Sequence, residues 1–469
     1  MDLLFKGGTV VTAKSTFKAD VAVTNGKISA IGAGLKPDKK TEVIDAKGKM
    51  ILPGAIDGHT HLAMPFGGTI ATDDYFTGTR AAACGGTTTV FDFVLQGVGE
   101  TMDAALKRRD DICKKDGPAC DYSYHIGVGD VTTPEMLASM DECMKMGVAT
   151  FKVFMVYDFG VDDGQFFETL QHAAKIGALV GVHAENREVN NALIKQYLAE
   201  GKTEAWWHYM SKNEAVAGEA DVRAINLAKM AGAPLYIVHL DNKQGVEAVA
   251  QARAEGFPIF AETCPQYLYF TKDVYKNGIP KLGLRARDFV CSPPMKGKES
   301  MDALWNGIKT GAVSTLATDH CPFHFRAGKA EKQYGKDDFT KCPNGAPGVQ
   351  ERLILLFSEG FMKGRISLPQ VVKYSSSNPC RMFGMYPQKG SLEPGTDADI
   401  VIIDPDKKTL IDKEYIRGAS DYSCYEGMQL DGCIDRVFLR GKEIVSEGEF
   451  LGKRGDGNYL KRGESILAE

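Results

Sequence analysis

The chain lacks the features of a membrane protein and of a secreted protein. No run of apolar residues approaches the roughly 18 that cross a bilayer, and the first ten residues, MDLLFKGGTV, lack the charged and apolar regions of a secretory leader. No stripe of lysine or arginine is present, and 56 basic against 61 acidic residues leave a net charge of -5. Because nucleic acids and anionic membranes bind basic surfaces, we expect neither partner, and a cytoplasmic protein that acts on a small molecule.

Disulfide frameworks and phosphate-binding glycine loops are also missing. Eleven cysteines are scattered from Cys84 to Cys433 without a C-x-x-C pair, which fits reduced and packed thiols. Neither G-x-G-x-x-G nor G-x-x-x-x-G-K occurs, so a doubly wound nucleotide-binding sheet is disfavoured. What the chain has is the balance of an ordinary globular protein, with 43% apolar and 25% charged residues.

Residues 51–387 alternate between apolar strand-like runs and amphipathic stretches of helical length. Eight such units predict an α/β fold in which eight parallel strands close into a (β/α)8 TIM barrel. An open parallel sheet is the alternative, and it would use fewer strands. The eight runs are ILPGAIDGH, TTTVFDF, DYSYHIGV, ATFKVFMV, ALVGVHAE, PLYIVHL, FPIFAETC and VSTLATDH.

Short β-rich runs separated by turns occupy both ends of the chain, in residues 1–50 and 388–450. Neither half has enough strands to be stable alone. We therefore expect the two halves to pack together as one β-sandwich domain beside the barrel. Residues 451–469 are polar and rich in glycine, which predicts either a solvated tail or an arm that orders on a neighbouring subunit.

Reactive side chains gather at the ends of the strand-like runs, which is where β/α barrels place their active sites. His59 and His61 close the first run, and residues two apart on a strand project to the same side, so both imidazoles can reach one metal ion. His183, His239 and Asp319 end three further runs. Four of the nine histidines thus accompany a carboxylate, which favours a metal site. Such mixed ligands suit zinc, with manganese, cobalt, nickel or iron as alternatives.

Lys152 lies inside the apolar run ATFKVFMV, where a charged amine is costly unless it is paired, neutralised or chemically altered. One interpretation is a lysine whose stem packs while its ammonium reaches a carboxylate. The other is a neutral amine that reacts with CO2 and becomes N6-carboxylysine, whose two oxygens can bridge metal ions. Together with the histidines, Lys152 favours a binuclear site. Cys321 is expected to pack rather than to bind metal, because Pro322 ends the strand.

Several ordered segments extend this interpretation to a known family: GAIDGHTHLAMPFGGT, FKVFM, VGVHAEN, IVHL, ETCPQYL, CSPPM, ATDHCPF and CPNGAPGV. With the terminal segments VAVTNGKISAIG and PQKGSLEPGTDADIVIIDP, they closely resemble the dihydropyrimidinase and hydantoinase branch of the cyclic amidohydrolases. The resemblance covers nearly the whole chain, and it implies two divalent metal ions and a homotetramer. It also implies a ligand set in which one metal is held by His59, His61 and Asp319, the other by His183 and His239, and both by carboxylated Lys152 with a bridging hydroxide.

The activity that this resemblance implies is hydrolysis of the cyclic amide bond of dihydropyrimidines and 5-substituted hydantoins to N-carbamoyl amino acids. Asp319 is expected to take a proton from the attacking hydroxide and return it to the leaving nitrogen. Tyr157 resembles a family tyrosine whose hydroxyl supports the oxyanion, and Ser292 and Asn344 resemble positions whose backbone groups hold the cyclic imide. Two departures affect loop geometry and substrate shape: the proline after the family's central Ser-Arg pair is replaced in SKNEAVAGEA, and the family's Glu is Gln350 in PGVQER.

Substrate choice is read from the loops that follow the strands. Dihydroorotase-like enzymes commonly carry an arginine just after the paired histidines, whereas Leu62 and Ala63 stand here, so a neutral ring is favoured. Allantoinase and a non-catalytic scaffold relative are the alternatives, and the complete ligand set argues against the scaffold. The residues expected to face the ring substituent are all apolar: Leu62, Met64, Phe66, Leu95, Phe154 and Phe159.

Overall fold

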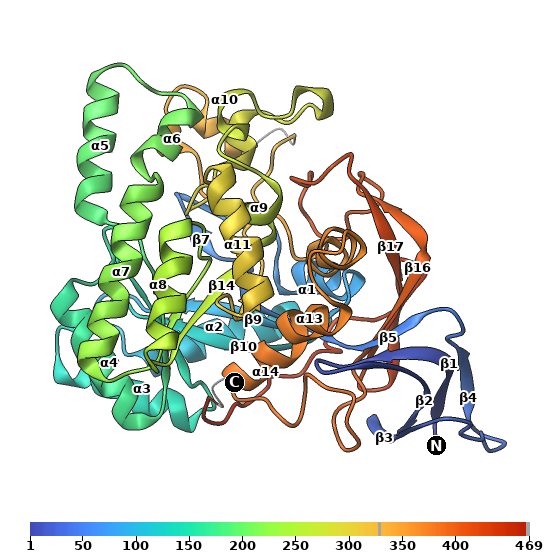
Figure 1. The fold of residues 1–469 in the computed structure, drawn as a ribbon. Helices are drawn as coiled ribbons and strands as arrows, with labels where there is room; N and C mark the ends of the chain where they lie inside the picture. Colours follow the sequence, from blue (N-terminus) through green and yellow to red (C-terminus); the bar gives the residue numbers. More distant parts are fainter. Residues whose placement is uncertain (327–329, 466–469) are drawn as a thin grey trace.

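A computed structural model of the protein describes residues 1–326 and 330–465. Its centre is a barrel of eight parallel strands, each hydrogen-bonded to the next (Figure 1). A parallel bridge between Thr60 and His320 brings the last strand beside the first, which closes the barrel. The predicted TIM barrel is therefore confirmed, and each of its strands overlaps one of the eight predicted runs. The strands are β6 (Ala55–Thr60), β9 (Thr87–Leu95), β10 (Asp121–Gly127), β11 (Thr150–Phe154), β12 (Leu179–His183), β13 (Leu235–Ile237), β14 (Ile259–Thr263) and β15 (Thr315–Leu316).

Helices surround this barrel, and Figure 1 shows α4, α7, α8 and α11 next to one another on its outside. Shorter helices lie in the loops and in the last third of the chain. The helices are α1 (Tyr75–Cys84), α2 (Met102–Asp116), α3 (Pro134–Lys145), α4 (Asp163–Ile176), α5 (Arg187–Ala199), α6 (Ala205–Ser211), α7 (Glu214–Ala231), α8 (Lys243–Ala254), α9 (Pro265–Tyr269), α10 (Val274–Asn277), α11 (Lys298–Thr310), α12 (Arg352–Leu355), α13 (Leu368–Val372) and α14 (Asn378–Met382).

Helix α4 illustrates how the sequence specifies these elements. The Asp162 side chain accepts a hydrogen bond from a backbone N–H of the first turn and so caps the helix. Phe166, Leu170 and Ala173 recur at the spacing of one helix face, and all three are buried against the barrel core. Gly177, with a φ of 73°, ends the helix in the left-handed conformation that glycine adopts without strain. The alternation of helix and strand thus follows from local signals.

The two ends of the chain form one nine-stranded sheet beside the barrel. Its halves join where β16 pairs antiparallel with β5. They also share an apolar core, in which the rings of Phe5 and Phe438 meet edge to face at 4.8 Å. The expected domain built from both termini is therefore confirmed. Its strands are β1 (Leu3–Val11), β2 (Thr16–Thr24), β3 (Lys27–Gly32), β4 (Glu42–Asp45), β5 (Met50–Pro53), β16 (Ile400–Leu410), β17 (Gln429–Leu439), β18 (Lys442–Ser446) and β19 (Glu449–Phe450).

The domain boundaries drawn from the sequence, at residues 50, 387 and 450, stay predictions. Strand β5 crosses the first of them, since it pairs with β1 and β16 of the terminal sheet. The only other short strands, β7 (Pro65–Phe66) and β8 (Thr69–Ile70), form a small hairpin among the described residues.

The last described stretch, residues 451–465, packs on the barrel of its own chain. At the N-terminal end of β10, the backbone N–H of Tyr122 donates to the Asn458 carbonyl at 3.0 Å, and that of Leu460 donates to the Tyr122 carbonyl at 2.8 Å. Leu460 and Arg462 are buried there. An apolar side chain and backbone hydrogen bonds therefore hold this segment on its own chain. Residues 466–469 lie outside the described part, and a role of this segment in an oligomer stays a prediction.

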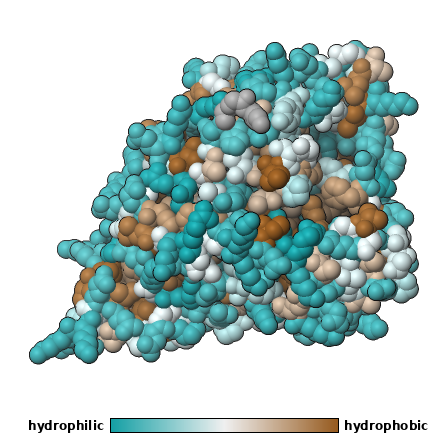
Figure 2. All heavy atoms as spheres, turned by 180° about the vertical axis from the view of Figure 1, so that it is seen from behind, coloured by the Kyte–Doolittle hydropathy of each residue, from teal (hydrophilic) through white to brown (hydrophobic). Residues whose placement is uncertain are grey.

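The cysteines of the chain form no disulfide bonds. All eleven cysteines are unpaired, and all but Cys433 are buried. Among the described residues, no helix combines the length and apolarity that crossing a membrane requires. Figure 2 shows a largely hydrophilic face on which apolar residues occur in small separate groups.

Candidate active site

The six predicted metal-binding side chains meet at the C-terminal end of the barrel strands. His59, Lys152 and His183 lie in β6, β11 and β12, whereas the other three follow closely after the ends of their strands. Two of those, His239 and Asp319, have φ values of 39° and 54°, and such left-handed backbone is uncommon for residues other than glycine. Backbone strain of this kind is concentrated at functional sites. The barrel thus brings together residues that are up to 260 positions apart in the chain, from His59 to Asp319.

The first group consists of His59, His61 and Asp319, whose ligand atoms all lie within 4.8 Å of one another. Oδ1 of Asp319 is 2.9 Å from Nε2 of His61 and 3.1 Å from Nε2 of His59. The opposite ring atom of His59, Nδ1, is hydrogen-bonded to Oε1 of Glu262 at 2.7 Å. Glu262 therefore orients His59 so that its Nε2 faces the group, which is the arrangement in which a histidine binds a metal ion.

The second group consists of His183 and His239, whose ring centroids are 4.4 Å apart. Nε2 of His239 is buried and has no hydrogen-bond partner among the described residues, and the same holds for Nδ1 of His61. A buried polar atom without a partner costs free energy, unless the site is built for a ligand. The described residues therefore fit a pair of divalent cations, one on each group.

Lys152 lies between the two groups and is almost wholly buried. Its Nζ is 3.0 Å from Nε2 of His59 and 4.4 Å from the centroid of the Phe93 ring. Burial lowers the pKa of Lys152, and the nearby carboxylates of Asp319 and Glu262 only partly offset that effect. Lowering the pKa favours the neutral amine, which is the form that can react with CO2.

A cavity of about 50 Å3 lies over these groups. Five of the six apolar residues that the sequence predicted to face a ring substituent line it. The polar residues Ser292 and Asn344 line it as well, on two loops after the strands. The full lining is His61, Met64, Phe66, Leu95, Lys152, Phe154, Tyr157, Phe159, His183, His239, Ser292, Asp319, Cys321 and Asn344.

Leu62 is the predicted lining residue that the structure places elsewhere. It is absent from the described lining of the cavity, is buried in the hydrophobic core, and packs against Gly78 of α1. Its neighbour His61 faces the cavity, and successive residues that leave a strand project to opposite sides. The side chain of Leu62 therefore points into the core, and its contact with substrate stays a prediction.

Tyr157 and Cys321 both line the cavity, but their chemistry differs. Burial raises the pKa of Tyr157, so its hydroxyl keeps its proton, and this hydroxyl also interacts with the side chain of Ser292. Burial likewise raises the pKa of the Cys321 thiol. Cys321 packs in an apolar cluster with Met64 and Phe323, as expected for a residue that binds no metal.

Three charged residues near the site were missed from the sequence. Glu262 orients His59, Glu185 accepts a hydrogen bond from His183, and buried Lys332 links the loops of Ser292 and Asn344. In the last case Nζ of Lys332 donates to the Val290 carbonyl at 2.6 Å and to the Pro343 carbonyl at 2.9 Å. One of the three carried a signal, because Glu185 is an acidic residue two positions after His183, just past the end of β12.

The two departures from the family pattern have local explanations. Asn213 replaces the usual proline and caps α7, since its Oδ1 accepts hydrogen bonds from the backbone N–H groups of Ala215 and Val216. Gln350 uses its whole amide group, donating to the Tyr415 carbonyl at 2.6 Å and accepting from the Arg417 N–H at 2.8 Å. Neither residue lines the described cavity.

Comparison with known proteins shows the family to which the chain belongs. The amidohydrolase family model matches residues 50–444. D-hydantoinases of Geobacillus stearothermophilus and Streptomyces coelicolor are 42% and 41% identical to this chain. Each comparison covers 98% of this chain and 97% of the relative. The crystal structure of dihydropyrimidinase from Brevibacillus agri NCHU1002 is 41% identical and superposes with a TM-score of 0.95 over 99% of both chains. Because these similarities extend over nearly the whole length, the chain belongs to the amidohydrolase family.

Proposed function

We propose that the protein hydrolyses the cyclic amide bond of dihydropyrimidines and 5-substituted hydantoins and releases N-carbamoyl amino acids. The observation that carries this proposal is the pair of imidazole groups flanking Lys152 at the floor of a largely apolar cavity. The names of the relatives, D-hydantoinase and dihydropyrimidinase, point to the same class of ring. No observation favours the alternatives, an allantoinase or a scaffold without catalytic activity.

Two divalent cations, which we propose to be zinc, are assigned to this site. His59, His61 and Asp319 would hold one, and His183 and His239 the other. Bound cations of this kind lower the pKa of a water molecule and polarise a carbonyl group. We further propose that Lys152 is N6-carboxylysine: its neutral amine adds to CO2, a carbon–nitrogen bond forms, and the proton released leaves to solvent. The carbamate would then supply an oxygen to each cation.

The side chains of the cavity account for the remaining steps. Asp319 lies within 3.1 Å of both His59 and His61, and its carboxylate takes a proton from the attacking water and returns it to the ring nitrogen that leaves. Tyr157, which keeps its proton, donates a hydrogen bond to the oxygen that becomes negative. The backbone of the loops that carry Ser292 and Asn344 orients the ring. These roles divide binding, proton transfer and charge stabilisation among different residues.

The lining of the cavity favours rings with an apolar substituent. Met64, Phe66, Leu95, Phe154 and Phe159 offer alkyl and aromatic surface to the space above the site. Alkyl and aryl groups at position 5 of a hydantoin match this surface, and so do dihydrouracil and dihydrothymine. The polar ureido group of allantoin finds no such match. A homotetramer and a cytoplasmic location complete the proposal.

Initial ring-opening rates test the proposal directly. Purified protein of known metal content is compared on dihydrouracil, 5-phenylhydantoin, allantoin and dihydroorotate under identical conditions. We expect turnover of the first two, with the faster of them identifying the preferred ring. Faster turnover of allantoin would overturn the substrate assignment, and no turnover on any of the four with two metal ions bound would overturn the ring class.

A further inference from the structure

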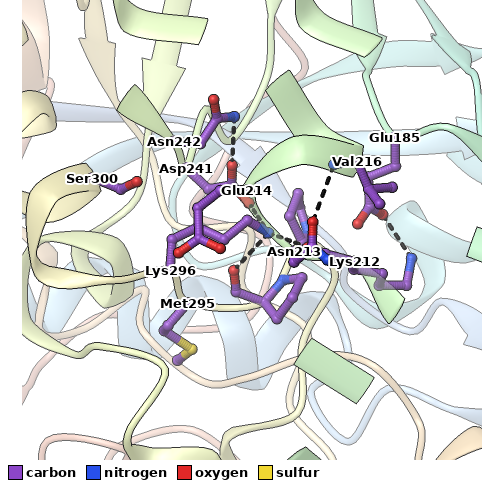
Figure 3. A network of polar contacts seen from close by, with 12 residues as sticks. Glu185, Lys212, Asn213, Glu214, Val216, Asp241, Asn242, Met295, Lys296 and Ser300 are labelled. Carbon is purple, nitrogen blue, oxygen red and sulfur yellow. Dashed lines mark hydrogen bonds and ion pairs between the residues drawn. The ribbon is translucent and has the colours of Figure 1, made fainter. Parts of the chain in front are cut away.

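Two buried lysines, Lys212 and Lys296, lie behind the second histidine group and take no part in the chemistry described above. Each pairs with an acidic residue that follows one of the histidines at two positions: Lys212 with Glu185 and Lys296 with Asp241, both at 2.7 to 2.8 Å. All four charged side chains are buried. Figure 3 shows the two ion pairs close together, with Lys296 between Asp241 and the backbone near Lys212.

Glu185 connects Lys212 to the second histidine group. Its Oε2 accepts hydrogen bonds from Nε2 of His183 at 2.7 Å and from Nζ of Lys212 at 2.7 Å, and one from the Ser292 hydroxyl at 3.4 Å. A carboxylate only accepts hydrogen bonds, so Nε2 of His183 carries the proton. The other ring nitrogen, Nδ1, is thereby left with its lone pair free for a metal ion.

Lys212 is held in place from its backbone as well as from its side chain. Nζ of Lys296 donates to the Lys212 carbonyl at 2.6 Å and to the Pro294 carbonyl at 3.2 Å, and it pairs with Asp241. The ammonium group of Lys212 also lies 5.6 Å from the ring centroid of Tyr157. Lys212 is therefore fixed at a position that faces both Glu185 and the cavity wall.

We propose that Glu185 and Lys212 are positioning residues for His183, and that they set the affinity of the second metal site. An isolated carboxylate at this depth is costly, and the ammonium of Lys212 compensates its charge. Glu185 then makes a charge-assisted hydrogen bond that fixes both the tautomer and the orientation of the imidazole. The inference rests on the proposed function, because it needs a metal ion on His183.

The test measures metal affinity rather than activity. Metal-free wild-type protein and its variants are titrated with Zn2+ against a chromophoric chelator, which gives the affinities of the first and second ion separately. Lys212→Met should weaken the second ion by about 10- to 100-fold, the usual effect of removing such a supporting residue, and leave the first ion unchanged. Lys212→Arg, which keeps the positive charge, should restore most of that affinity.

Lys389→Met is the matched control. Lys389 is as deeply buried and pairs with Asp121 and Asp399, but it lies at the opposite end of the barrel strands. This variant should melt at a lower temperature and, measured well below that temperature, should bind two ions with wild-type affinity. If it loses the second ion as Lys212→Met does, general destabilisation explains the result and the positioning role is wrong.

Glu185→Gln keeps the test decisive if Lys212→Met fails to fold. The amide is similar in size, but it loses the charge that strengthens the hydrogen bond to His183, so the second ion should again bind more weakly. A second-ion affinity within twofold of wild type in either folded variant overturns the inference, while two ions on the wild-type protein leave the proposed function standing. A wild-type protein that binds no second ion overturns both.

Discussion

The two ends of the barrel both hold buried polar side chains, but the hydrogen-bonding needs of these side chains are met differently. At the N-terminal end of the strands, Lys389 pairs with Asp121, Asp397 and Asp399, so its ammonium is surrounded by carboxylates of its own chain. At the C-terminal end, Nε2 of His239 and Nδ1 of His61 have no such partner among the described residues. Buried polar groups therefore occur in two settings. A cluster in which every group has a partner stabilises the fold, and a cluster with unpartnered atoms is built to receive a ligand.

Of all the changes considered, Lys152→Ala should cause the largest loss of metal binding and activity at the C-terminal end of the barrel strands. If Lys152 is the proposed carbamate ligand of both cations, the variant loses that ligand, and we expect activity to fall below detection together with metal content. Metal analysis and ring-opening rates check this. Small carboxylic acids added to the variant should restore part of both, and normal metal content with full activity would remove the carbamate from the account.

Asp319→Asn is the next largest expected change. The amide cannot shuttle a proton, so kcat should fall by about 10²- to 10⁴-fold. Steady-state kinetics on the best substrate measure the change, and the melting temperature of the variant serves as a check on its folding. Turnover close to wild type would show that another group carries the proton.

Lys389→Met removes the ion-pair cluster at the N-terminal end of the barrel strands and should leave the ring-opening activity unchanged. Without the ammonium group, three buried carboxylates lose their cationic partner, which lowers the free energy of unfolding by about 3 to 5 kcal/mol. Denaturant unfolding measures the loss, and kcat of the folded variant should equal that of wild type. A drop in kcat with unchanged stability would erase the contrast between the two ends.

The pH dependence of the same contact sharpens the comparison. Burial alone would lower the pKa of Lys389, but its three carboxylate partners outweigh burial and raise it above the ordinary 10.5. A raised pKa means that the folded state binds the proton more tightly than the unfolded state, so the stabilisation is complete below about pH 10 and is lost only above it. Unfolding free energies of wild type and Lys389→Met should converge in that alkaline range, and a constant difference would contradict this.

Phe159→Ala should have the smallest effect. The ring of Phe159 lies at the cavity, is partly exposed and stacks on the ring of Tyr157 at 5.3 Å. Its loss removes apolar contact with a large substituent and also removes this neighbour of Tyr157. We expect KM for 5-phenylhydantoin to rise by about tenfold, equivalent to partial loss of one buried aromatic contact, with KM for dihydrouracil unchanged. Equal changes for both substrates would place the substituent elsewhere.

The sequence was sufficient for the barrel and for the residues at its strand ends. Each barrel strand is a continuous apolar run because it is buried on both faces, and a histidine or aspartate that interrupts or ends such a run is conspicuous. The same regularity made Lys152 stand out. The structure brings these side chains together at one end of the barrel, as the order of the strands requires.

The supporting contacts could not be predicted in the same way. Glu262 and His59 are 203 positions apart, and Lys389 and Asp121 are 268 apart, so no local pattern pairs them. Leu62 packs in the core against Gly78, a contact that the sequence around it does not specify. The docking of the C-terminal segment could not be predicted, because Arg462 finds its backbone acceptor on Tyr124, 338 positions earlier. Partners distant in sequence and single unusual φ angles are set by tertiary packing.

The most direct test of the account is a count of metal ions per chain in protein purified without chelator. If the unpartnered imidazoles at the C-terminal end of the barrel are metal ligands, mass spectrometry of the metals should find two divalent ions per chain, and removal of both should abolish ring opening until they are restored. Full ring-opening activity in protein that carries less than one ion per chain would contradict the central claim.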